Sequence, residues 1–241
     1  AFVSVAWSHR EPERNNFTDN GAYPAPKPES LLDYELGYNF GGKVFQAGMT
    51  AYYMDYRNQF VQTGAISDIG EALTTNIARS YRLGLEITAD LHPLSWMDIF
   101  ADAALSRNRI LDFDEQAEDW DNGARTIHYS QSTLAFSPSA ILGGGFRLHS
   151  HGAALSWRTS YVSRQYLDNT ECLRRSLPGY SSTDLNLSYT WTPKFKCVRD
   201  MTFGLRLGNI FNAHYAASGW VYSAICESAG HPDWNRYTQI G

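Results

Sequence analysis

An acidic run is the first feature of this 241-residue sequence whose residue types could do chemistry. It holds six carboxylates, at Asp112, Asp114, Glu115, Glu118, Asp119 and Asp121. Carboxylate oxygens are the ligands that Ca²⁺ prefers. An EF-hand loop, however, needs glycine at the position that Ala117 occupies here. We therefore expect a solvated acidic loop over residues 111–123, and no metal site.

Cysteine and histidine offer two further possibilities. The strand pattern described below places Cys172 and Cys226 in loops on the same side of the protein. During assembly these loops would pass through an oxidising compartment, where disulfides can form. The two residues either form a disulfide or remain free thiols, because connectivity cannot be deduced from sequence. Cys197 is expected in a short turn as a lone thiol. His149 and His151 could hold a metal, but we expect them to form part of a polar turn.

Signatures of catalysis and of cofactor binding are missing from the sequence. It contains no G-x-S-x-G, H-E-x-x-H or C-x-x-C motif. The glycines at 143–145 follow a predicted strand but open no helix, as a dinucleotide site would require. We therefore expect no enzyme and no cofactor. A net charge of −5 without a basic patch argues against a nucleic-acid partner.

β-Strands are the elements that must position these residues, and residues 33–40, "DYELGYNF", show their pattern. Tyr34, Leu36, Tyr38 and Phe40 fall on one face, and the polar residues between them fall on the other. In a soluble sheet the aromatic face would be buried. In a membrane barrel that face meets lipid, while the polar face lines a wet lumen.

Strand-like stretches recur along the chain, joined alternately by short and long connections. We predict nine of them, at 1–9, 31–41, 43–61, 76–92, 95–110, 130–149, 152–166, 180–192 and 199–212. Short periplasmic turns alternating with long extracellular loops are typical of an outer-membrane barrel. No apolar run approaches the roughly 18 residues of a transmembrane helix.

Three architectures share this alternation, and strand length and aromatic placement favour one of them. Several predicted strands exceed the mean of about 5–6 residues in soluble proteins and reach the roughly 9–11 that cross a bilayer. Aromatic residues gather near the strand ends, as in interfacial girdles. A soluble β-sandwich binding module remains the first alternative. A small self-contained barrel, porin or enzyme, would need a closed strand count, whereas nine is odd. We therefore expect a piece of a larger barrel.

One stretch, residues 202–215, sharpens this prediction. Its strand runs into a G-x-x-x-x-N-[IL]-F-[ND]-x-x-Y motif, matched by Gly204, Asn209, Phe211, Asn212 and Tyr215. The motif resembles the penultimate strand of TonB-dependent outer-membrane receptors. "REPERNNF", "PKPESLLDYELGYNF", "YVSRQYLDNT" and "LPGYSSTDLNLSYTW" are similar to other segments of that family, in the phrasing of its Bacteroidetes branch.

The resemblance implies an all-β fold, a transmembrane antiparallel barrel of about 22 strands around an N-terminal plug. Residues 1–241 would form the C-terminal portion of that barrel, about nine to ten strands, without the plug or the first strands. Family members take up a scarce ligand, commonly a ferric siderophore or haem, with energy from a TonB complex that engages the plug. The implied partners are outer-membrane lipid, the TonB complex, a small ligand such as a ferric chelate, and in some cases a surface lipoprotein.

Candidate ligand-binding residues lie in the predicted outer loops. Arg174 and Arg175 suit an anionic chelate, because guanidinium groups form charge-assisted hydrogen bonds. Trp120, Trp220 and Tyr222 could stack on a planar ligand. Ordinary loop packing is the alternative for each of them. A further set of charged residues is expected to face the lumen and to pair with a plug or with each other: Glu35, Arg82, Glu86, Arg158 and Arg206.

Overall fold

The computed structural model describes residues 1–18, 25–66, 71–193, 198–226, 228 and 231–240. Cys197 lies outside these ranges, as do the side chain of Tyr222 and those of the last strand. Within the described ranges, no helix is long and apolar enough to cross a membrane.

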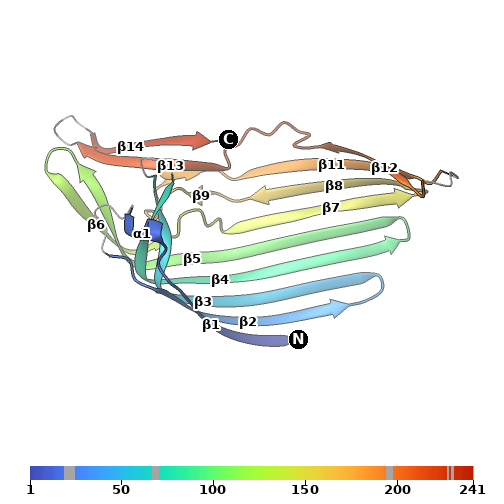
Figure 1. The fold of residues 1–241 in the computed structure, drawn as a ribbon, viewed down its shortest axis with the longest axis horizontal. Coiled ribbons are helices and arrows are strands. Elements are labelled where there is room, and N and C mark those ends of the chain that lie inside the picture. The colour runs from blue at the N-terminus through green and yellow to red at the C-terminus, as the bar shows by residue number, and fades with distance from the viewer. Residues whose placement is uncertain (19–24, 67–70, 194–197, 227, 229–230, 241) are drawn as a thin grey trace.

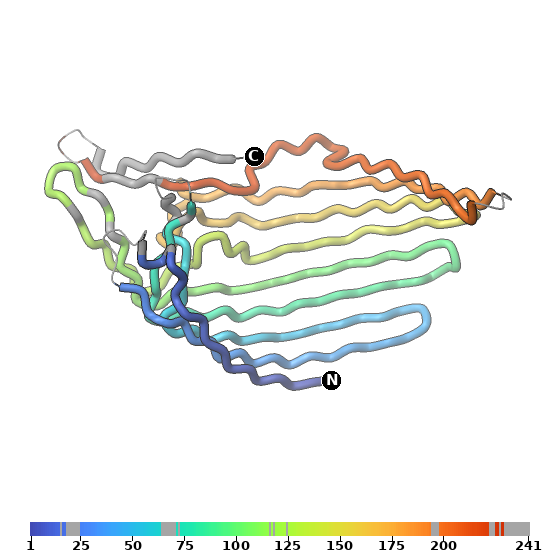
Figure 2. The backbone as a smooth tube through the Cα atoms, viewed as in Figure 1, coloured from blue at the N-terminus to red at the C-terminus, as the bar shows by residue number. Residues whose placement is uncertain are grey.

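Nine strands form one antiparallel sheet, drawn in Figure 1. In sheet order they are β1 (Phe2–Arg10), β2 (Glu29–Gly41), β3 (Phe45–Ile66), β4 (Ala72–Leu94), β5 (Met97–Asp119), β7 (Ala140–Ser150), β8 (Ala153–Val162), β11 (Tyr180–Trp191) and β12 (Met201–Leu207). The short connections lie together at one end of the sheet, as Figure 2 shows, and the long ones at the other. We call these the turn end and the loop end. Each of the outermost strands, β1 and β12, has a single neighbour along this path, so the described sheet does not close.

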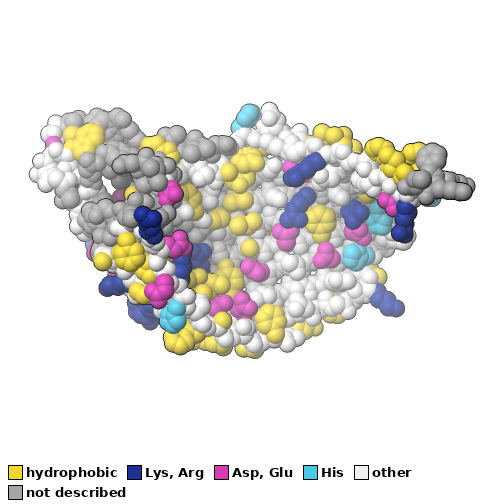
Figure 3. Space-filling view, in the orientation of Figure 1, with side chains coloured by type: hydrophobic (Ala, Val, Ile, Leu, Met, Phe, Trp, Pro, Cys, Tyr) yellow, Lys and Arg dark blue, Asp and Glu magenta, His cyan; other side chains and the backbone are white. Residues whose placement is uncertain are grey.

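The sheet has two unlike faces. Register pairs Tyr34 with Tyr53, and Tyr53 with Leu83, so that apolar residues of neighbouring strands share one face. That apolar face continues across the sheet through exposed hydrophobic residues: Leu36, Tyr38, Phe40, Met49, Leu105, Leu142, Tyr161, Leu187, Tyr189, Phe203 and Leu205. Thr50 and Glu86 are direct register partners on the opposite, polar face, and Glu35 lies on the same face opposite Tyr52. In Figure 3, acidic, basic and histidine side chains are interspersed over the polar face.

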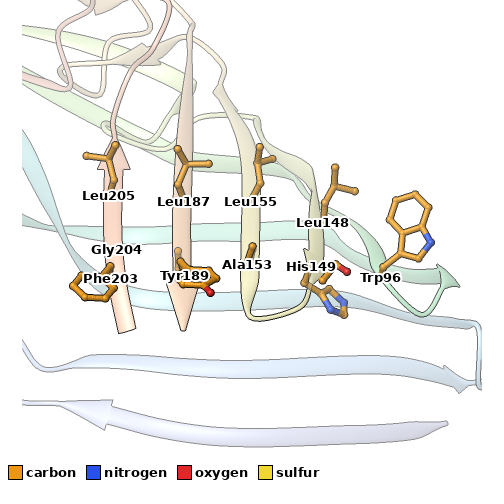
Figure 4. Close-up of a pocket in the computed structure, with 13 residues that line it drawn as sticks. Trp96, Leu148, His149, Ala153, Leu155, Leu187, Tyr189, Phe203, Gly204 and Leu205 are labelled. Carbon is orange, nitrogen blue, oxygen red and sulfur yellow. The ribbon is translucent and has the colours of Figure 1, made fainter. Parts of the chain in front are cut away.

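A single sheet with an uncovered apolar face is inconsistent with the soluble β-sandwich alternative, in which a second sheet would bury these aromatics. Figure 4 shows this face near the turn end. Leu148, Leu155, Leu187 and Leu205 form a row across four strands. The row borders an open hollow of about 820 Å³, whose lining also includes Trp96, Ala153 and Tyr189. The apolar face is thus continuous and contoured.

The loop end is built differently, because further elements pack over the sheet there. β6 (Gly123–Thr133) pairs with the outer half of β5. β13 (Ser218–Cys226) pairs with β14 (His231–Ile240), and lies parallel to β5 at Ala224 and Ile225. The remaining elements are α1 (Arg14–Thr18), β9 (Gln165–Tyr166), η1 (Leu173–Arg175) and β10 (Ser176–Leu177). Two buried clusters form here: Val61, Ile77, Ile110, Phe113 and Leu134 in one, and Leu167, Leu177 and Val221 in the other.

Three sequence predictions need correction at this end. The predicted strand 130–149 is two strands, because Phe136 has a positive φ and Pro138 lacks an N–H, so residues 134–139 leave the ladder. The predicted strand 199–212 ends at Leu207. Most of the predicted acidic loop, up to Asp119, is strand β5. α1 and β13 were not predicted as elements.

Candidate functional site

A ladder of ion pairs runs across the polar face at mid-strand. Arg158 on β8 donates to Asp102 on β5 at 2.9 Å, across β7, and its guanidinium lies 5.6 Å from the centre of the Phe100 ring. Arg206 on β12 donates to Asp184 on β11 at 2.7 Å. The two arginines therefore pair with aspartates of the wall, Asp102 and Asp184, which were not in the predicted lumen-facing set.

Two glycines of β7 make the contact across that strand possible. A Cβ atom at Gly143 would collide with the Asp102 carboxylate, and one at Gly145 would collide with the backbone carbonyl of Trp157. The same Cβ at Gly145 would lie 2.9 Å from Phe100 Cζ. The glycine run at 143–145 therefore provides room for an aromatic ring and an ion pair on the polar face.

Two further groups lie on the polar face, and only Arg82 and His149 among their members were singled out from sequence. Arg82 lies 5.9 Å from the centre of the Tyr56 ring. Nearer the turn end, Asp98 accepts from or pairs with two histidines, His92 at 2.8 Å and His149 at 3.4 Å. Counting alternate residues along β3 from Tyr53 would have placed Tyr56 on the polar face, opposite to the face that carries the aromatic girdle. The histidine pair, in contrast, depends on cross-strand register that the sequence does not give.

A buried ion network fixes the loop 163–179 at the loop end. Arg175 Nη1 donates to Asp168 Oδ2 and to Glu115 Oε1, both at 2.8 Å. Burial alone would lower the pKa of Arg175, but the Asp168 carboxylate, followed by that of Glu115, outweighs it and raises the pKa. Tyr129 Oη donates to Glu115 Oε2 at 2.9 Å. Burial, and then the charge of Glu115, raises the pKa of Tyr129.

The loop is held by its amide side chains as well. Asn169 is completely buried, accepts from the backbone N–H of Ala135 at 2.8 Å, and donates to the backbone carbonyl of Gln62 at 2.7 Å. Asp168 accepts from both the N–H and the hydroxyl of Thr170. The polar groups of this loop are therefore largely used in joining it to β3 and to the segment after β6.

The predicted ligand residues have different environments. Arg174 is exposed on η1, whereas Arg175, next to it, is buried in the ion network. Trp120 is half exposed at the tip of the β5–β6 hairpin, where its backbone N–H donates to the backbone carbonyl of Ile225 in β13. Trp220 is half buried in β13. The structure thus brings Trp120 and the β13 strand of Trp220 to one rim, and directs Arg175 inward.

The cysteines match one of the two alternatives left open by the sequence, whereas some of the carboxylates depart from expectation. Cys172 and Cys226 are both free thiols, so the structure does not contain the disulfide alternative. Glu115 and Asp119 are buried rather than solvated. Asp119 Oδ1 accepts from the N–H groups of Asp121 and Asn122, which shapes the hairpin turn. Within the described part of the chain, no three His, Cys, Asp or Glu side chains converge as metal ligands.

The motif after β12 forms a corner. Asn209 and Asn212 have φ values of 48° and 50°, in the left-handed region that asparagine tolerates. The Asn209 side chain exchanges two 2.9 Å hydrogen bonds with the backbone of Ala213, and its N–H donates to Asp184. Tyr215 stacks on Tyr180 at 4.0 Å between ring centres. The asparagines therefore turn the chain away from the sheet beside the ion-pair ladder.

The other two motif residues have simpler environments. Phe211 packs edge-on against Trp157 of the apolar face, at 5.8 Å between ring centres. Gly204 lies in β12 with open space where a Cβ would be. Nothing in the structure explains glycine at that position.

Comparison with known proteins decides the family. The sequence pattern of the family described as "TonB dependent receptor-like, beta-barrel" matches residues 1–213. The chain belongs to the TonB-dependent receptor β-barrel family. This is a family of outer-membrane transport receptors, which identifies the apolar face as lipid-facing and the polar face as the lumen wall. No curated protein sequence matches the chain.

Solved structures show the same fold at low identity. The copper transporter OprC is 16% identical, with a TM-score of 0.62 over 89% of this chain and 32% of that one. The ferric-catecholate import receptor Fiu from E. coli K12 is 18% identical, with a TM-score of 0.61 over 97% of this chain and 30% of that one. The ferric yersiniabactin uptake receptor FyuA from Yersinia pestis is 14% identical, with a TM-score of 0.61 over 98% and 32%. This chain spans about a third of the length of these structures.

Proposed function

We propose that this chain forms part of an outer-membrane receptor that takes up a scarce ligand, a ferric siderophore or haem, with energy supplied by TonB. The observation that carries the proposal is the register, which places charged and aromatic side chains on the lumen wall and apolar ones toward lipid over nine strands. A wall of this kind surrounds a hydrated path through a bilayer.

Residues 1–241 would supply the C-terminal portion of the barrel, and the plug that contacts TonB would belong to a part of the protein outside this chain. The length relation supports this assignment, because the chain spans about a third of the solved receptors. The ladder of Asp102, Arg158, Asp184 and Arg206 would then face the plug.

Side chains at the loop-end rim support the proposed ligand class. Arg174 is exposed there and can donate charge-assisted hydrogen bonds to an anionic chelate. Trp120 and Trp220 offer aromatic surface on the same side. Solved relatives include importers of ferric chelates, and also a copper transporter, so the ligand must be tested directly.

Uptake by cells carrying the full-length receptor tests the function. A strain that depends on this receptor is given radiolabelled iron as ferric enterobactin or as haem, with and without a functional TonB gene. We expect TonB-dependent accumulation of one of the two. Accumulation of neither, or accumulation that does not need TonB, would contradict the proposal.

A matched pair of variants tests the rim. Arg174→Ala should weaken binding of the anionic chelate to the purified receptor by about tenfold, as expected for loss of a charged hydrogen bond. Arg199→Ala removes an equally exposed arginine at the turn end, and should leave the affinity unchanged. Equal affinity of the two variants would remove Arg174 from the site.

A further inference from the structure

The aromatic side chains at the turn end of the lipid-facing side are interrupted at two neighbouring strands. Trp96 stands on one side of the interruption, and Tyr189 and Phe203 stand on the other, each between 46% and 55% exposed. In the register row of Tyr189 and Phe203, β8 contributes Ala153 and β7 contributes Ser150. Aromatic residues are typical of the boundary between hydrocarbon and headgroups. Two small side chains therefore leave a gap at that boundary.

This gap belongs to the hollow of about 820 Å³ that Figure 4 shows, which we call the girdle hollow. Leu148, Leu155 and Leu187 line it two residues further along their strands, toward the middle of the bilayer. The backbone N–H of His149 donates to the carbonyl of Trp96 at 2.8 Å, which holds the β4–β5 turn beside β7. The tryptophan is thereby fixed as one border of the hollow.

Polar atoms lie at the turn side of the girdle hollow. Among the residues that the structure describes, neither the indole N–H of Trp96 nor the hydroxyl of Tyr189 has a hydrogen-bond partner. Both groups are donors on the edge of an apolar ring. In the adjacent β7–β8 turn, Ser150 Oγ and His151 Nδ1 lie 2.7 Å apart. The hollow is therefore apolar toward the bilayer centre and offers donors toward the turn.

We propose that the girdle hollow holds one glycerophospholipid of the inner leaflet. A hydrocarbon chain of this lipid lies against the leucine row, and its ester carbonyl groups accept hydrogen bonds from Trp96 and Tyr189. The hollow is continuous with the lipid-facing surface, so its occupant comes from the membrane, and its apolar walls disfavour water.

Two contributions distinguish this site from the remaining apolar surface. Lipid tails are as apolar as leucine, so a tail gains no hydrophobic free energy by moving from lipid to protein. Prolonged residence must then come from the shape of the hollow and from the two donors. The inference rests on the lipid-facing assignment of this side of the sheet, and not on the identity of the transported ligand.

Photo-crosslinking from a defined lipid tests this. The full-length receptor is reconstituted in phosphatidylethanolamine vesicles, in which a small fraction of the lipid carries a diazirine near the ester end of one chain. After illumination, labelled peptides are identified by mass spectrometry. We expect residues 148–155 to be labelled in preference to residues 38–47, which lie at the same turn end and carry outward aromatics. Equal labelling of the two segments would overturn the proposal.

A matched pair of variants tests the shape of the hollow. Ala153→Trp fills the gap with an aromatic side chain, so the preference for residues 148–155 should be lost. Ala101→Trp adds the same side chain at an exposed, lipid-facing position of β5 outside the hollow, and should retain the preference. Heat-modifiable migration verifies that both barrels have folded. An undiminished preference in Ala153→Trp would contradict the proposed occupant.

Removal of the donors tests the ester contacts. The double variant W96F/Y189F keeps both rings and deletes the indole N–H and the hydroxyl. The preference should fall about two- to tenfold, as expected for lost hydrogen bonds. Full retention would overturn the assignment of the two donors.

A second receptor copy is the competing occupant. It would protect residues 148–155 from the lipid label increasingly as the ratio of receptor to lipid rises. The proposed lipid predicts no such dependence, so protection of this kind would overturn the proposal.

The iron-uptake assay distinguishes this inference from the proposed function. Preferential labelling that Ala153→Trp abolishes, in a receptor that takes up neither iron compound, would keep the lipid site and remove the transport assignment. TonB-dependent uptake together with equal labelling of the two segments would do the reverse.

Discussion

The turn half and the loop half of this chain use the same strands and are stabilised in different ways. Near the turns, each strand separates two media, and an ion pair such as Arg158–Asp102 leaves 48% and 40% of its side chains exposed. Near the loops, further strands and the loop 163–179 bury part of the sheet, and Arg175–Asp168 leaves 7% and 6% exposed. An arginine–aspartate ion pair is therefore solvent-exposed in the turn half and buried in the loop half.

The distribution of buried residues gives the same contrast. The buried hydrophobic side chains of the described residues all belong to the loop half, from Val61 to Cys226. The turn half has an apolar exterior in place of a core, as expected where lipid replaces a second layer of protein. A substitution should therefore have an effect that depends on which half holds it and which face it occupies.

The largest effect is expected from Arg175→Met, which leaves the carboxylates of Asp168 and Glu115 buried without their cation. Breaking a buried pair in this way costs about 3–5 kcal/mol. We expect loop 163–179 to open more readily, measured as faster amide exchange of Leu167 and Leu177. Arg158→Met on the lumen wall should cost no more than about 1 kcal/mol, because that pair is solvated. Equal effects at the two sites would erase the contrast between the halves.

The next prediction concerns the two faces of β11. Leu187→Arg should destabilise the barrel in lipid vesicles by about 2–4 kcal/mol, since a charge on the lipid face near the bilayer centre is costly. Asn186→Arg, one residue away on the lumen wall, should cost little. Denaturant unfolding of both variants in vesicles measures the difference. If the two positions tolerated arginine equally, our orientation of the sheet would be wrong.

Adjacent glycines of β7 give a sharper version of the same test. Gly145→Ala should cost about 1–3 kcal/mol, because its methyl group would collide with the Trp157 carbonyl and crowd Phe100. At Gly144 the methyl would meet the carbonyl oxygen of Phe100 at 3.5 Å, an ordinary contact. Gly144→Ala should therefore stay within about 0.5 kcal/mol. Thermal or denaturant midpoints of the two receptors decide between these outcomes, and a larger loss at Gly144 would contradict the geometry.

The turn half was largely predictable from sequence because the two faces of its strands meet different media. Where lipid and water lie on opposite sides, residue types alternate with a period of two, and the strand predicted at 31–41 is β2 with small shifts at its start. The family motif was equally visible, since its two asparagines supply the left-handed corner.

The loop half was less predictable because its buried positions hold charged residues such as Glu115 and Asp119 as well as apolar ones, so residue type no longer follows burial. Residues 111–119 appear as an acidic loop, yet they form the outer part of β5 with Glu115 inside. Arg174 and Arg175 are adjacent and identical in type, and only tertiary packing makes one a surface residue and the other an anchor. Cross-strand register is likewise information that one sequence does not contain.

The smallest predicted effect is a dependence on pH at Tyr129 in the loop half. Its pKa is raised above the ordinary value of 10.0 by burial and by Glu115. The neutral phenol therefore contributes fully to the stability of the closed hairpin below about pH 10. This stability is lost as pH rises further, because Tyr129 ionises at lower pH in the opened state than in the closed one. Tyr129→Phe should cost about 1 kcal/mol at neutral pH through the lost hydrogen bond to Glu115.

The same variant should also flatten the alkaline part of the profile. Protease cleavage within residues 111–133 measures opening of the β5–β6 hairpin, and we expect it to accelerate above pH 10 more steeply in the unaltered receptor than in Tyr129→Phe. Tyr52 lies on the lumen wall in the turn half of β3, and its Phe variant serves as a control. Tyr52→Phe should leave cleavage of the hairpin unchanged at every pH. If cleavage of the hairpin in Tyr129→Phe accelerated above pH 10 as much as in the unaltered receptor, a group other than the Tyr129 phenol would cause the opening. The prediction for the loop half would then be wrong.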